Sequence, residues 1–91
     1  MKKSYTRLIK KVASCLLLDV RELEKVERAD GKILTDCIQV SDMYKIFYIC
    51  ADSLDDVMVY DRELNLKYNI SKDVYKTEIE KAVGLTMALT M

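Results

Sequence analysis

Residues 43–51, MYKIFYICA, decide the fold class of this chain. Aromatic and β-branched side chains dominate the segment, and such residues favour strands. Lys45 is its only charged residue. In an extended chain alternate side chains share a face, and one face would carry Tyr44, Ile46, Tyr48 and Cys50. Both faces of this strand are therefore apolar, and both need cover.

The segments around this strand continue a β-rich pattern. Residues 57–60 and 64–70 predict a hairpin turning around 61–63, because the side chains of 64–70 alternate between apolar and polar. Residues 32–40, KILTDCIQV, fit either a strand or a helical face, and their β-branched content favours a strand. The middle of the chain thus predicts an antiparallel meander of about three to four strands.

The first part of the chain predicts a long helix over residues 4–28, with Ser4 as a possible cap. Asp19 is the difficulty, because it falls in the middle of the apolar face, where an unpaired carboxylate is costly. Asp19 could instead cap a second helix, with Glu22 completing a capping box. One continuous helix and two abutting helices both remain open. The apolar positions are Tyr5, Leu8, Ile9, Val12, Leu16, Val20, Leu23 and Val26.

The last part of the chain predicts a second helix that opens at Ser71 and carries Asp73 in its first turn. Its end, LTMALTM, is uncharged and indicates packed turns or an interface. The fold expected is a single α+β domain over 1–91, with an N-terminal helix, a meander and a C-terminal helix. The alternative is an all-α fold, because apolar residues within 43–58 also match a helical stripe.

Composition excludes several classes of function. The chain has no His, no recognisable nucleophile–base motif and no Gly-rich phosphate loop, so we expect no enzyme, no cofactor and no metal site. The three cysteines make no CxxC pair and predict buried free thiols in a reducing cytoplasm. The 12–15 stretch, VASC, looks like a lipoprotein cleavage site but follows charged residues, and no apolar run could span a bilayer.

The strongest local charge lies in the first eleven residues, MKKSYTRLIKK, within a chain of zero net charge. On a helix, Lys3, Arg7, Lys10 and Lys11 share the face opposite the apolar one. Two like-charge pairs at i,i+4 and basic charge in a first turn are mildly destabilising. An anionic partner would remove those costs, whereas the simpler interpretation is a solvated face.

A second cluster of charge is acidic and comprises Asp52, Asp55, Asp56, Asp61 and Glu63. These residues do not follow the alternating pattern of a calcium loop, and we interpret them as a solvated connection. Apolar surface beyond what a small core needs predicts self-association. The expected oligomer interface comprises Tyr44, Ile46, Tyr48, Leu85 and Met87.

Taken together, these features predict a small non-enzymatic interaction or regulatory protein. It would form a homo-oligomer and bind an unidentified protein partner through the basic N-terminal helix, with no role for a membrane. The small, motif-free sequence resembles accessory or inhibitor proteins of phages and mobile elements. The alternative is a nucleic-acid or nucleotide-phosphate binding protein that uses the same basic stripe.

Overall fold

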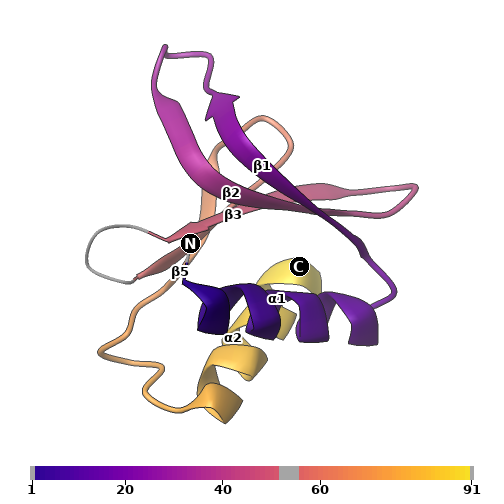
Figure 1. Cartoon of the computed structure of the whole chain (residues 1–91), viewed down its shortest axis with the longest axis vertical. Helices are drawn as coiled ribbons and strands as arrows, with labels where there is room; N and C mark the ends of the chain where they lie inside the picture. Colours follow the sequence, from indigo (N-terminus) through magenta and orange to yellow (C-terminus); the bar gives the residue numbers. More distant parts are fainter. Residues whose placement is uncertain (1, 52–55, 91) are drawn as a thin grey trace.

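The computed structural model describes residues 2–51 and 56–90. Its elements are α1 (Lys3–Cys15), β1 (Asp19–Glu27), β2 (Ile33–Ser41), β3 (Ile46–Ala51), β4 (Val57–Tyr60), β5 (Leu66–Ile70) and α2 (Glu78–Thr90). The strands form one antiparallel meander in the order β1-β2-β3-β4-β5, and both helices lie on the same side of it (Figure 1). This confirms the predicted α+β fold, and the all-α alternative is not supported.

The main core lies between the two helices and the sheet. Ile9 of α1 and Leu89 of α2 are fully buried there, and they belong to the same cluster as Val40, Ile49 and Val59 on three neighbouring strands. The alternation expected for 43–51 holds over β3, because Phe47 and Ile49 face the helices while Tyr48 and Cys50 face the other way. Burial of these side chains is what fixes α1 and α2 against the sheet.

The far face of the sheet carries a second, smaller cluster. Its buried members are Cys37, Cys50, Tyr60 and Leu64. Cys37 and Cys50 lie directly opposite each other on β2 and β3, with their Cα atoms 4.8 Å apart, and form a disulfide. The prediction of three buried free thiols is therefore wrong. Because the expectation of a reducing cytoplasm rested on free thiols, this disulfide removes its support.

The long N-terminal helix predicted over 4–28 is also wrong in its second half. Helix α1 ends at Cys15, where the amide of Leu18 donates to the carbonyl of Ala13 at 2.8 Å and the amide of Leu17 donates to that of Ser14 at 3.2 Å. Leu17 takes a positive φ of 59°. These two bonds and the left-handed residue make a Schellman cap, which turns the chain into β1. At the other end Lys2, not Ser4, precedes the helix, and its side chain provides no cap.

Helix α2 begins later than predicted. Ser71 does not open it; its hydroxyl accepts a hydrogen bond from the amide of Asp73 in a turn. Thr77 is the residue that caps α2, because its hydroxyl accepts the amide of Glu80 at 3.1 Å. The carboxylate of Glu80 in turn accepts the amide of Lys76. Thr77 and Glu80 thus have the spacing of a capping box, a signal that was present in the sequence.

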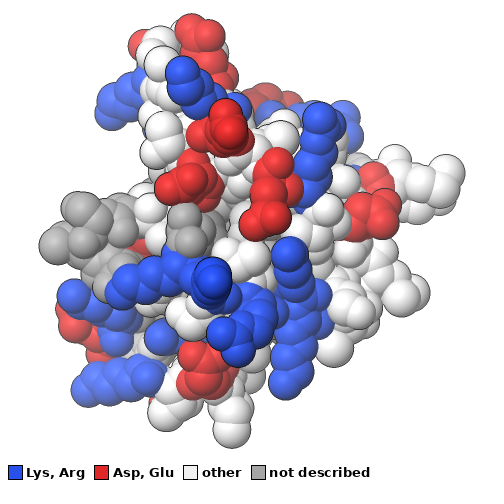
Figure 2. Space-filling view, in the orientation of Figure 1, with Lys and Arg blue, Asp and Glu red and all other residues white. Residues whose placement is uncertain are grey.

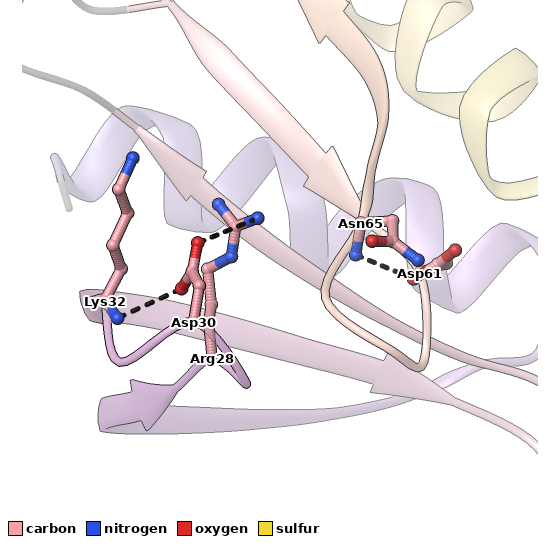
Figure 3. Close-up of polar contacts among 5 residues, drawn as sticks. All are labelled: Arg28, Asp30, Lys32, Asp61 and Asn65. Carbon is pink, nitrogen blue, oxygen red and sulfur yellow. Dashed lines mark hydrogen bonds and ion pairs between the residues drawn. The ribbon is translucent and has the colours of Figure 1, made fainter.

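Several acidic residues fix turns rather than forming a site. Asp61 accepts the amide of Asn65 at 2.9 Å in the β4–β5 turn (Figure 3). In the β1–β2 turn, Asp30 accepts the amide of Lys32 and lies 3.6 Å from the guanidinium of Arg28 (Figure 3). Such side-chain bonds to backbone amides are typical of Asp in turns. Two further acids of the predicted acidic connection, 52 and 55, lie outside the described residues.

Candidate functional site

The four basic residues singled out from the sequence all lie on the exposed face of α1. Lys3, Arg7, Lys10 and Lys11 point away from the core side of the helix, which buries Leu8 and Val12 among others. Figure 2 shows Lys and Arg side chains gathered over α1, with acidic side chains above them over the sheet. The structure thus places these residues on one exposed helix face; whether they bind a partner stays a prediction.

These four residues differ in how much of their charge is neutralised. Lys10 lies 4.0 Å from the carboxylate of Glu22 on β1, and both side chains are more than half exposed. Such a pair stabilises little. In the described part of the chain, no ion pair involves Lys3, Arg7 or Lys11. The first turn of α1 also holds no acid, so its positive charge opposes the helix dipole. This end of the molecule therefore has uncompensated positive charge.

A groove runs beside this charge, between α1 and α2. It encloses about 680 Å³ and is open to solvent. Leu8 and Val12 of α1 and Ala82 of α2 give it an apolar floor. Arg7 and Lys11 line its α1 side, and the exposed side chain of Ile79 stands on its α2 side. The remaining lining residues are Ser4, Cys15, Glu78 and Thr86. Lys3 and Lys10 do not line the groove, so the structure divides the predicted basic stripe into two parts.

Contacts from several parts of the chain hold the two helices that form the groove. The ammonium group of Lys81 on α2 lies 5.2 Å from the centre of the Tyr5 ring on α1, a cation–π contact. At the far end of α2, the ammonium group of Lys45 donates to the carbonyl oxygen of Leu89 at 3.1 Å. Lys45 belongs to the β2–β3 turn and supplies the positive charge that the last turn of α2 lacks.

Tyr75, which precedes α2 in the chain, contacts the middle of that helix. Its hydroxyl is 2.6 Å from the hydroxyl of Tyr68 on β5, and its ring packs against Gly84 of α2. The hydrogen bond with Tyr68, together with partial desolvation, raises the pKa of Tyr75 above its usual value of 10.0. The α1–α2 groove is therefore bounded by helices whose positions are set by several independent contacts.

Cys15 lies at the end of this groove and is exposed. The prediction that this thiol is buried is wrong. The helix ends at this residue, so no later turn covers the thiol. Within the described residues it is the free cysteine that remains once Cys37 and Cys50 are joined. Because the thiol of Cys15 is accessible and lines the groove, its reactivity should report whether a ligand occupies the groove.

The residues expected at an oligomer interface are dispersed in the structure. Leu85 is 1% exposed in the main core, so it offers no surface to a second copy, and its assignment to an interface is corrected. Ile46 and Tyr48 are half-buried on the far face of the sheet, where Tyr48 packs against the second cluster. Tyr44 is 85% exposed in the β2–β3 turn. Met87 stands on the outer face of α2.

Hydrogen bonds made by Asp42 hold the β2–β3 turn that carries Tyr44. The carboxylate of Asp42 accepts the amides of Tyr44 at 2.7 Å and Lys45 at 2.9 Å, while the amide of Asp42 donates to the carbonyl of Lys45. The bond from the amide of Tyr44 is the main reason that the pKa of Asp42 lies below its usual value of 3.8. This turn holds Lys45 where it can reach the end of α2.

Other kinds of site find no support in the described residues. Across 2–51 and 56–90, His, Cys, Asp and Glu side chains nowhere gather in a group of three or more able to hold a metal ion. Neither described helix has the length and apolar character needed to cross a membrane. No protein-family model, curated protein or solved structure matches this chain. The α1–α2 groove is the candidate site because it combines uncompensated charge with an apolar floor.

Proposed function

We propose that this chain is a small non-enzymatic interaction module that binds an acidic, amphipathic helix of a partner protein in the α1–α2 groove. The observation that carries the proposal is the meeting of an apolar floor with the two basic side chains of Arg7 and Lys11. Amphipathic helices bind such grooves by laying their apolar face on the floor. Acidic side chains at the edge of that apolar face would then lie against the basic rim.

The dimensions of the groove support a short helix as the ligand. Its lining residues run from Ser4 to Cys15 along α1, which corresponds to roughly 16 Å of helix. Three turns of a bound helix span about the same length. Ser4, Arg7, Lys11 and Cys15 recur at three- and four-residue steps, so one side of α1 faces the groove over its whole length. The open side allows such a segment to enter without rearrangement of the core.

The proposal is tested with synthetic helices of about 14 residues. One carries Leu on one face and Glu on both flanks, and its matched counterpart carries Lys in place of Glu. Fluorescence anisotropy should show that the chain binds the Glu peptide and not the Lys peptide. An Arg7→Gln/Lys11→Gln variant removes two charge pairs of about 0.2–1 kcal/mol each, so affinity for the Glu peptide should fall roughly 2- to 30-fold.

The matched control is Lys3→Gln/Lys10→Gln, which removes the same charge from the same helix but outside the groove. At an ionic strength of about 150 mM it should change affinity less than about twofold, because screening weakens charges that make no direct contact. Equal losses in the two double variants would reject the groove as the site. Tighter binding of a DNA or RNA oligonucleotide than of the Glu peptide would favour the nucleic-acid alternative instead.

A further inference from the structure

The outer face of α2 is an apolar ridge without cover in the described structure. Ile79, Val83 and Met87 follow one another at four-residue steps and are 78%, 53% and 48% exposed. The inner face of the same helix buries Leu85, Ala88 and Leu89 in the core. From Ala82 to Thr90 the helix has no charged residue, and its exposed polar side chains there are Thr86 and Thr90. A contiguous row of exposed apolar side chains is typical of an interaction surface.

We propose that this ridge pairs with the same ridge of a second copy of the chain, with the two α2 helices antiparallel. In a two-fold pair centred on Val83, Ile79 of each copy lies opposite Met87 of the other, and the two Val83 side chains meet at the axis. Two-fold contacts of this self-complementary kind are the commonest in homo-oligomers. The ridge shares Ile79 with the lining of the α1–α2 groove, whereas Val83 and Met87 are not among the groove's lining residues.

Charge selects the antiparallel arrangement. The first turn of α2 carries Glu78 and Glu80, and its last turn lies beside the ammonium group of Lys45. Antiparallel helices place the acidic end of each copy next to the Lys45 end of the other and oppose the two helix dipoles favourably. Parallel helices would bring the two first turns together, where Lys81 offsets only part of the charge of Glu78 and Glu80. Charge and the helix dipoles therefore favour the antiparallel orientation over the parallel one.

The size of the ridge sets the strength expected. The exposed parts of its three side chains amount to about two whole side chains per copy, which is less than a stable, specific interface buries. We therefore expect a weak dimer, with a dissociation constant of about 10 µM to 1 mM. Sedimentation equilibrium across that concentration range should show a monomer–dimer equilibrium. A chain that stays monomeric up to about 1 mM overturns the proposal.

Two substitutions test the place and the orientation of the contact. Val83→Lys puts two positive charges at the axis and should abolish the dimer, whereas Val74→Lys, at an exposed position outside α2, should leave it unchanged. Circular dichroism establishes that both variants are folded. On a Cys15→Ser background, Val83→Cys should oxidise readily to a covalent dimer and Val74→Cys should not. A dimer that survives Val83→Lys, or equal cross-linking at both positions, contradicts the proposal.

Discussion

Whether Gly84→Ala stabilises or destabilises the chain depends on the aromatic ring of Tyr75. At an ordinary helix position, Gly→Ala stabilises a protein by about 0.5–1 kcal/mol. Here an added Cβ would lie 3.0, 3.2 and 3.4 Å from three atoms of the Tyr75 ring. That ring cannot retreat freely, because its hydroxyl is bonded to Tyr68 and its backbone amide donates to Ser71 at 2.9 Å. Crowding of this kind costs about 1–3 kcal/mol.

The net expectation for Gly84→Ala is a loss of about 1 kcal/mol in the free energy of unfolding, measured by urea denaturation with circular dichroism. In a Tyr75→Ala background the ring is absent, and the same substitution should become stabilising by about 0.5–1 kcal/mol. A Tyr75→Phe background keeps the ring but frees it from Tyr68, so an intermediate loss is expected. If Gly84→Ala stabilises the wild-type chain as much as the Tyr75→Ala variant, the inferred packing of Tyr75 on α2 is wrong.

Two further predictions concern the turn and the disulfide. Cys37→Ala/Cys50→Ala should lower the free energy of unfolding by about 3 kcal/mol, as expected for a link across 13 residues. Thiol titration of the unreduced, unfolded wild type should find one reactive thiol, and finding three would contradict the disulfide. Asp42 has a lowered pKa in the folded state, so its stabilising contribution is present above pH 3.8 and is lost as the pH falls through the folded value. The difference in Tm between wild type and Asp42→Ala should therefore shrink below about pH 3.8, and a constant difference down to about pH 2 would refute this role.

The sequence predicted the meander well because its strands alternate locally. Residues 57–60 coincide with β4, and the hairpin to 64–70 and the strand within 43–51 were recognised from their period of two. β1 was mistaken for helix, since Val20, Leu23 and Val26 recur every three residues. In the structure Leu23 and Val26 pack against the same far-face cluster, although residues three apart in a regular strand point to opposite faces. The alternation of β1 is therefore interrupted between them. On the neighbouring strand β2, Asp36 lies between the residues paired with Leu23 and Lys25, and its φ is 52°.

The candidate site was predictable only in part. The exposed basic face of α1 follows from helical periodicity, which is a local property. The groove is not local, because it depends on where α2 packs beside α1. Lys45 and Lys81 hold α2 there through contacts distant in sequence. The disulfide likewise depends on the register of β2 and β3, which places Cys37 opposite Cys50. Cysteine spacing alone carries no information about that register.

The most direct test of the proposed function is where an acidic helix binds. Amide chemical shifts of the ¹⁵N-labelled chain would be followed as the Glu-flanked peptide is added, at a concentration where the chain is monomeric. We predict that the changes concentrate on the groove residues Arg7, Lys11, Cys15, Ala82 and Thr86, and that the far face of the sheet is unaffected. Changes centred on the sheet, or spread equally over basic residues throughout the molecule, would contradict the assignment of the α1–α2 groove as the binding site.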